Sequence, residues 1–278
     1  MGFKLTFCCN SPFQTSSNNK YLCISQKTKL RLRYFLKLSY KGTAYHGWQI
    51  QPNAQSVQEV LQNALQTVLR CEISVVAAGR TDTGVHAKMM YAHFDLDNLP
   101  YEIQICIFKL NSLLPKDIAV IDIINVADDA HARFDAKKRT YEYQINQHKN
   151  PFDTEGSWYF RHTLDLELMN KAAEILLQKT DFESFSKVHT EVNNFRCKIT
   201  KALWERTEDS LIFTISADRF LRNMVRAIVG TLINVGTHKI TLAEFETIID
   251  SKNRSEAGFS VPAHGLYLTA VDYDYIPR

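Results

Sequence analysis

The chain has 278 residues, of which 45% are hydrophobic, so it can bury a substantial core in one large domain or in two fused halves. Its formal net charge of +3 is too small to indicate a nucleic-acid partner without further observations. No apolar run approaches the roughly 18 residues of a membrane span, so we expect no membrane association.

The N-terminal segment is basic and has no regular pattern. Eight Lys and Arg residues precede the first acidic residue, Glu59, whereas the other 25 basic and 30 acidic residues give a net charge of −5. Such asymmetry is typical either of an arm that binds a polyanion or of a solvated leader. Residues 1–30 mix polar and isolated apolar side chains without a period, so we expect a poorly ordered extension there.

The first regular elements are expected from Leu32 onward. Residues 32–40 alternate between two faces, as a half-buried strand does. Ser56 and Glu59 have the spacing of a capping box, and the apolar stripe that follows to Leu69 predicts a helix. The next expected elements are a strand at 73–78, a strand at 88–96, a helix at 103–114 and a strand at 118–126.

The same β-α-β-β-α-β order recurs in the second half. The expected elements are a strand containing Tyr141, Tyr143 and Ile145, a helix at 166–177, a hairpin of 198–206 and 211–217, helices at 222–235 and 241–250, and a strand at 265–273. We therefore expect an α+β fold in which two ferredoxin-like halves, 31–135 and 136–278, join into one mixed, mainly antiparallel sheet. Helices would cover one side of the sheet, and a central cleft would lie where the halves meet.

The six cysteines are Cys8, Cys9, Cys23, Cys71, Cys106 and Cys197. They form no CxxC motif and have no paired metal-ligand spacing. We interpret them as reduced thiols of a cytoplasmic protein.

The segment GRTDTGVHA, residues 79–87, lies between two expected strands. Gly79 and Gly84 bracket it and allow a tight, irregular backbone path. A cation within a few ångströms favours an ionised carboxylate, so Arg80, if it pairs with Asp82, makes Asp82 a nucleophile or an electrostatic partner. The alternative is a structural turn in which Asp82 bonds to its own backbone and Arg80 is solvated.

A metal site is a second interpretation of the same region, with Asp82, His86 and His93 as ligands. His86 and His93 are seven residues apart, which places them on opposite faces of an alternating strand. No further carboxylate or Cys completes the set at ligand spacing. We therefore expect no metal and interpret His86 as a loop-packing or substrate-contacting residue.

Three arginines, Arg219, Arg222 and Arg226, gather where a helix is expected to begin. Arg222 and Arg226 are four apart and so share a helix face. Cations at this end oppose the helix dipole, and a bound anion would reverse that cost. Phosphate is the natural candidate, because helix N-termini and guanidinium groups both favour it.

Aromatic and basic side chains alternate in two further segments, 40–51 and 131–141. Flat rings beside cations suit splayed bases and phosphates. Packing within the sheet is the competing explanation and the better one for Trp48 and Tyr143. It fits Tyr141 less well, because Tyr141 begins a strand beside a basic cluster.

Taken together, these segments resemble the tRNA pseudouridine synthase A family. The matching stretches are Tyr40-x-Gly-x-x-Tyr45-x-Gly-Trp-Gln-x-Gln51, Ser56-Val-Gln, GRTDTGVHA, Ala132-Arg-Phe134, Arg139-x-Tyr141-x-Tyr143, Asp181-Phe-Glu-Ser-Phe185, Phe220-Leu-Arg-Asn-Met-Val-Arg226 with Ile-Val-Gly230, and Gly265-Leu-Tyr-Leu268. They run in the family's order from about residue 32 to 273. The segment before Arg31 looks longer than the family's usual start.

The resemblance implies a cytoplasmic, homodimeric isomerase that converts uridine to pseudouridine at positions 38 to 40 of the tRNA anticodon stem-loop. It implies that Asp82 is the catalytic residue, that Arg80 pairs with it and helps to extrude the nucleotide, that Tyr141 stacks on the uracil and assists proton removal from C5, and that Arg226 also holds the aspartate. No cofactor is implied. Asp82 either attacks C1′ or takes the C2′ proton.

Two other functions remain to be distinguished by experiment. A non-catalytic tRNA-binding protein on the same fold would bind tRNA without isomerising any uridine. A metal-dependent phosphoesterase would use Asp82, His86 and His93.

Overall fold

The computed structural model describes residues 31–187, 194–208 and 210–277. The expected N-terminal extension at 1–30 lies outside the described residues. Within them, the strands are β1 (Leu32–Tyr40), β2 (Val76–Ala77), β3 (His86–Leu96), β4 (Ile118–Val126), β5 (Lys138–Asn146), β6 (Trp158–Tyr159), β7 (Ile199–Arg206), β8 (Ser210–Ala217) and β9 (Leu266–Asp272). The helices are α1 (Val57–Leu69), α2 (Ile103–Leu113), α3 (Leu166–Leu176), α4 (Met224–Gly236) and α5 (Leu242–Asp250), with short 3₁₀ turns at Gly42–Ala44, Glu183–Phe185 and Ala263–Gly265.

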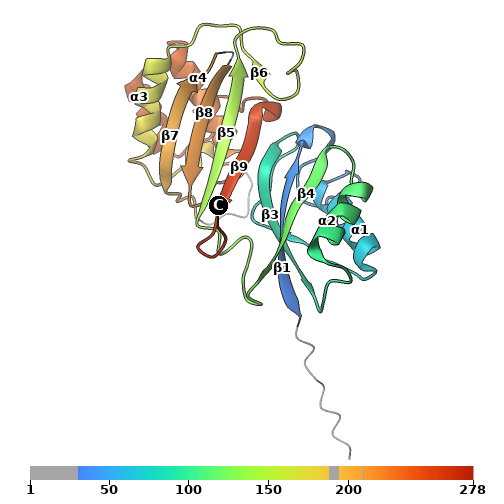
Figure 1. The fold of residues 1–278 in the computed structure, drawn as a ribbon. Coiled ribbons are helices and arrows are strands. Elements are labelled where there is room, and N and C mark those ends of the chain that lie inside the picture. The colour runs from blue at the N-terminus through green and yellow to red at the C-terminus, as the bar shows by residue number, and fades with distance from the viewer. Residues whose placement is uncertain (1–30, 188–193, 209, 278) are drawn as a thin grey trace, which may run out of the picture. The chain divides into compact units, whose positions relative to one another are not determined.

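The strands form a single sheet in the order β4-β1-β3-β9-β5-β8-β7, with β2 added to β3 and β6 added to β5 (Figure 1). Most pairs are antiparallel, but β6 runs parallel to β5, and β9 runs parallel to β3, with His86 opposite Tyr267 and Ala87 opposite Leu268. The β3–β9 pair joins strands of the first half to strands of the second. The expected α+β fold with a mixed, mainly antiparallel sheet is confirmed.

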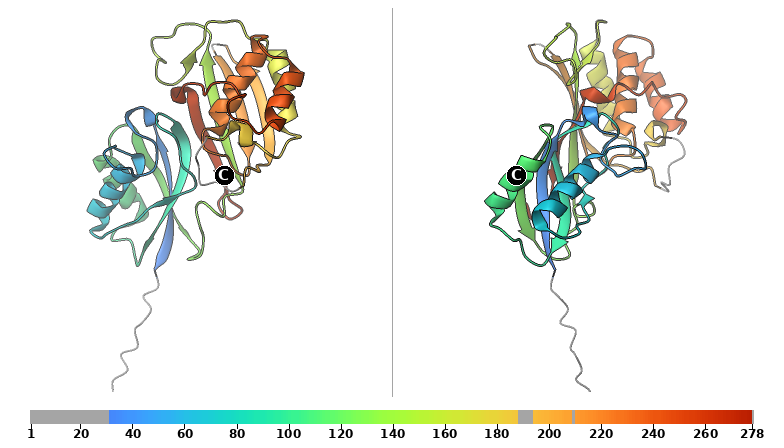
Figure 2. Two further views of the ribbon diagram at one scale, coloured as in Figure 1. Left: turned by 180° about the vertical axis from the view of Figure 1, so that it is seen from behind. Right: turned by 90° about the vertical axis from the view of Figure 1, so that its right-hand side faces the viewer.

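Two hydrophobic cores lie within this fold. One contains β1, β3 and β4 with α1 and α2, and the other contains β5, β7 and β8 with α3, α4 and α5. Figure 2 shows α4 and α5 over one face of the strands of the second half. The two cores exchange residues: Val85 belongs to the second core, whereas Leu268 and Val271 of β9 belong to the first.

The expected strand at 73–78 is wrong in length, because only β2 pairs with a neighbouring strand. Glutamine side chains of helix α1 instead form hydrogen bonds with the backbone of Val75. The side chain of Gln62 accepts from the Val75 N–H at 3.0 Å, and Gln58 donates to the Val75 carbonyl at 2.9 Å. Side-chain partners therefore replace a strand ladder here.

The helix expected from Arg222 begins two residues later, at Met224. Asn223, at its N-cap, has φ 66°, in the left-handed region that interrupts a helix. Arg222 thus lies outside α4 and does not share a helix face with Arg226. At the start of α5, Thr241 and Glu244 form a complete capping box.

The described cysteines are free thiols. Cys106 and Cys197 are buried and Cys71 is exposed; Cys8, Cys9 and Cys23 lie outside the described residues. In the part of the chain that the structure describes, no helix is long and apolar enough to cross a membrane.

Candidate active site

The loop that carries Asp82 connects β2 to β3 and is closed by a turn in which the Val85 N–H donates to the Asp82 carbonyl at 3.1 Å. Gly84 has φ 78°, a conformation that a side chain would strain, so glycine is required there. Gly79 shows no such need, since a Cβ built on it meets no atom within 4 Å. Backbone freedom therefore explains one of the two glycines.

The end of β1 and the segment that follows it support this loop. The Tyr40 hydroxyl lies 2.8 Å from the Thr81 hydroxyl in a buried hydrogen bond. The Trp48 N–H donates to the Thr81 carbonyl at 3.2 Å. Gly47 approaches so closely that a Cβ there would lie 2.5 Å from the same carbonyl oxygen.

Trp48 itself is buried, with 3% of its surface exposed, and Tyr143 is fully buried and donates to the Pro262 carbonyl at 2.8 Å. The expectation that these two aromatic residues pack within the sheet is confirmed. They are supporting residues and offer no ring face to a nucleotide.

His86, where the loop meets β3, has hydrogen-bond partners at both ring nitrogens. Its Nδ1 accepts from the Gly42 N–H at 2.9 Å, and its Nε2 lies 3.0 Å from the His264 carbonyl and 3.1 Å from the Glu155 carbonyl. This pattern fits the neutral tautomer with the proton on Nε2. Burial lowers the pKa of His86, which favours the same neutral form.

The metal interpretation is not supported by this geometry. The Nδ1 of His93 accepts from the Ala132 N–H at 3.1 Å, and its ring stacks on Phe35 at 6.0 Å. Among the described residues, no group of three His, Cys, Asp or Glu side chains could hold a metal ion. His86 and His93 act as hydrogen-bonding residues of the interior.

Asp82 is partly exposed, with 26% of its side-chain surface accessible. Among the described residues, the cation within ion-pair distance of it is Arg222, whose Nε lies 3.6 Å from Asp82 Oδ1 and whose side chain is 59% exposed. The spacing of the arginines predicts that Arg222 lies on a helix face and binds a phosphate. The backbone turn at Asn223, which no sequence signal predicted, instead directs it to the carboxylate.

The two arginines that the family resemblance places beside Asp82 are Arg226 and Arg80. Arg226, in the first turn of α4, donates from Nε to the Val261 carbonyl at 2.7 Å. Arg80 is exposed and forms no hydrogen bond or ion pair with any described residue. The pairing of Arg80 and Arg226 with Asp82 stays a prediction.

Tyr141 lies in β5, half-buried, with its ring edge-on to Phe220 at 5.2 Å. Burial, together with the negative charge of Asp82, raises the pKa of Tyr141 to about 12. At neutral pH the phenol keeps its proton.

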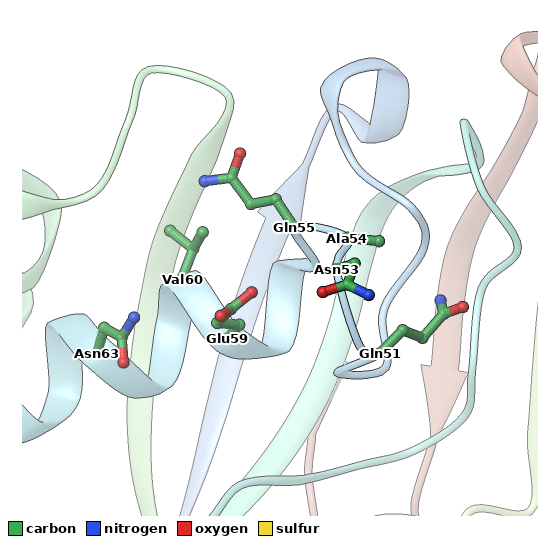
Figure 3. A pocket seen from close by; sticks show the side chains of 7 residues that line it. All are labelled: Gln51, Asn53, Ala54, Gln55, Glu59, Val60 and Asn63. Carbon is green, nitrogen blue, oxygen red and sulfur yellow. The ribbon is translucent and has the colours of Figure 1, made fainter.

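A polar hollow of about 340 Å³ lies beside the N-terminus of α1 (Figure 3). Its lining residues are Gln51, Asn53, Ala54, Gln55, Glu59, Val60 and Asn63. None of them belongs to the loop of Asp82, so this hollow is separate from the candidate active site.

The family of this chain follows from its similarity to known proteins. A family model described as tRNA pseudouridine synthase matches residues 38–135 and 172–274. The chain belongs to the tRNA pseudouridine synthase family. Asp82 lies in the first matched stretch, Arg222 and Arg226 lie in the second, and Tyr141 lies between them.

Individual relatives agree with this assignment and confirm the resemblance seen in the sequence. Proteins named tRNA pseudouridine synthase A from Bacteroides fragilis and Parabacteroides distasonis are 51% and 49% identical over 242 and 241 residues, each match covering 87% of this chain and 96% of the relative. A protein of the same name from Thermoanaerobacter sp. is 40% identical, over 85% of this chain and 97% of its own length. Members of this family are isomerases, so the chain is placed among enzymes that rearrange a nucleoside.

Proposed function

We propose that this chain isomerises uridine to pseudouridine at positions 38 to 40 of the tRNA anticodon stem-loop. The observation that carries the proposal is the Asp82 carboxylate, held beside the Arg222 guanidinium in a loop that the Tyr40–Thr81 hydrogen bond supports. The relatives named tRNA pseudouridine synthase A supply the substrate class.

The reaction requires breakage of the C1′–N1 bond, rotation of the detached uracil and formation of a C1′–C5 bond. Asp82 acts on the ribose, either by attacking C1′ or by removing the C2′ proton. Arg222, whose Nε lies 3.6 Å from Asp82 Oδ1, orients the carboxylate before the substrate arrives. Neither route needs an oxidant or a phosphoryl donor.

Arg80 and Tyr141 act on the base. The target nucleotide must leave its stack, at a cost of a few kcal/mol, and the exposed Arg80 side chain is free to occupy the gap. Tyr141 offers a ring for stacking on the uracil. Because its pKa is about 12, Tyr141 is a protonated phenol at neutral pH, so it accepts the C5 proton only while it passes its own proton to water.

The division into halves 31–135 and 136–278 belongs to this proposal. Asp82 comes from the first half, whereas Arg222, Arg226 and Tyr141 come from the second. Support for two halves comes from the two hydrophobic cores, which the parallel pairing of β3 with β9 and the packing of Val85 into the second core join together. The junction of the halves is also where we place the bound tRNA.

Tritium release from tRNA labelled at uridine C5 tests this function. We expect the intact protein to release tritium and Asp82→Ala and Asp82→Asn to lose release while still binding tRNA. Transcripts in which the uridines at 38, 39 and 40 are replaced should release none. Binding without release by the intact protein would favour the non-catalytic alternative and contradict the proposal.

We further propose that two copies of the chain associate. Helix α2 presents Ile105 and Phe108, one turn apart, with exposed fractions of 44% and 73%. Apolar side chains gathered on one helix are typical of an interface. Sedimentation should give a dimer that Phe108→Asp dissociates, whereas Phe152→Asp, on a loop residue 97% exposed, should leave it intact.

We propose the cytoplasm as the site of action, because tRNA is found and modified there. Reduced cysteines are consistent with that compartment. Cell fractionation with the tagged chain checks this, and recovery with the membrane pellet after a high-salt wash would contradict it.

A further inference from the structure

Arg139, at the start of β5, donates hydrogen bonds to four backbone carbonyl groups from four positions of the chain. Its Nη1 donates to the carbonyls of Ala136 at 2.8 Å and Asp218 at 2.7 Å. Its Nη2 donates to those of Ala78 at 2.9 Å and Arg133 at 2.7 Å. One planar guanidinium thus connects both halves of the chain.

The surroundings of Arg139 differ from those of a phosphate-binding arginine. Arg139 is half-buried, and burial is the main influence that lowers its pKa. Among the described residues it makes no ion pair with a carboxylate. Since both terminal nitrogens already donate within the protein, Arg139 is an internal connector, although the sequence groups it with the basic and aromatic side chains expected to contact RNA.

The positions of two of these carbonyls are informative. Ala78 is buried and immediately precedes the loop, four residues before Asp82. Asp218 stands four residues before Arg222 in the segment that leads to α4. The Arg139 guanidinium therefore holds the backbone four residues before each partner of the Asp82–Arg222 ion pair.

Tyr141 belongs to the same unit, because it follows Arg139 by two residues in β5 and points to the same face of the sheet. A shift of Arg139 would displace the loop, the arginine segment and this ring relative to one another. Misplacement of reacting groups by about 1 Å can lower a rate about 100-fold.

We infer that Arg139 is a positioning residue that sets the alignment of Asp82, Arg222 and Tyr141 across the junction of the two halves. This inference rests on the proposed isomerase function. Arg139 touches no reacting atom, and acts by holding the backbone at Ala78 and Asp218. A lysine cannot replace it, because one ammonium group has three donors and no planar fork to reach four carbonyls.

Substitution at Arg139 separates this role from phosphate binding. For Arg139→Lys we expect kcat at saturating tRNA to fall about tenfold or more. The Kd for tRNA should stay within about twofold, and the slope of log affinity against log salt should not change, because no phosphate contact is lost. Arg161→Lys, at an exposed arginine outside the site, is the matched control.

Chemical rescue gives a readout that a merely structural role would not move. Guanidinium ion at non-denaturing concentration should restore part of the kcat of Arg139→Ala, and methylammonium at equal ionic strength should not. If guanidinium has no effect on a folded Arg139→Ala, or if the salt slope drops by about one with weaker binding, the positioning role is refuted.

Hydrogen exchange distinguishes failure of this inference from failure of the proposed function. In Arg139→Lys, amides of residues 79–85 and 218–223 should exchange faster together, while those of β1 and α1 keep the wild-type rates. Faster exchange throughout the chain, or no change in either segment, would overturn the inference. Absence of tritium release by the wild-type protein would instead refute the isomerase proposal, without affecting the exchange result.

Discussion

The hydroxyl groups of Tyr40 and Thr81 lie 2.8 Å apart in the interior, so β1 is bonded directly to the residue before Asp82. Both side chains are buried, with 4% and 7% of their surfaces exposed. Water therefore cannot replace either partner, and the bond fixes the backbone from which the Asp82 carboxylate projects. This brace explains why a tyrosine ends the strand.

Removing both partners of this pair should cost less than the two single removals added together. We expect Tyr40→Phe to lower the free energy of unfolding by about 1–3 kcal/mol, because the Thr81 hydroxyl is left buried and unsatisfied. Thr81→Val should do the same, and the double variant should lose less than the sum of the two. Denaturant unfolding measures the cycle, and strict additivity would show that the two hydroxyls do not interact.

Gly47 gives a second test of the same support. Its φ of 86° and the approach to the Thr81 carbonyl both exclude a side chain. We expect Gly47→Ala to destabilise the fold by about 1–3 kcal/mol and to lower tritium release by displacing the loop. Gly79→Ala, where a Cβ has open space, is the stability control; equal unfolding midpoints for the two variants would contradict the account.

Periodicity predicts most of this fold, because core-facing residues repeat with the period of their element. Leu32–Tyr40 and Ile118–Val126 match the expected strands residue for residue. The exceptions depend on nonlocal contacts. Residues 73–75 satisfy their backbone groups through glutamines of α1, and β6 pairs for two residues only.

The candidate active site could be predicted only in part, because it also depends on nonlocal contacts. The family resemblance gave Asp82, but its contact with Arg222 depends on a left-handed backbone turn at Asn223. In the sequence, Arg139 is one more cation in a basic cluster. Its hydrogen bonds to four carbonyls form only in the assembled sheet, so no local sequence pattern predicts them.

Arg222 should matter for catalysis and little for stability. The ion pair with Asp82 is largely exposed, and such pairs contribute about 0–1 kcal/mol to folding. Arg222→Met should therefore unfold at nearly the wild-type denaturant concentration, yet lose about tenfold or more in kcat, equivalent to about 1.4 kcal/mol of barrier. Arg222→Lys should recover part of the rate; full activity of Arg222→Met in the tritium assay would exclude a role for the pair.

The buried His93 should make the fold sensitive to acid. Burial, followed by the positive charge of Arg33 and the neighbouring His131, lowers the pKa of His93 from its usual 6.5 to about 4, and the charges of Asp95 and Asp135 offset this only in part. Because the unfolded chain takes up this proton first, the free energy of unfolding should decrease as the pH falls from about 6.5 to about 4.

His93→Asn isolates this contribution, because the amide oxygen can accept from the Ala132 N–H in place of Nδ1 but does not titrate. We expect the variant to lose less stability than the wild type between pH 6.5 and pH 4, measured by urea unfolding at each pH. The difference should build up across that interval and then level off, since below the folded pKa both states carry the proton. Parallel curves for the two proteins would assign the acid sensitivity to other groups.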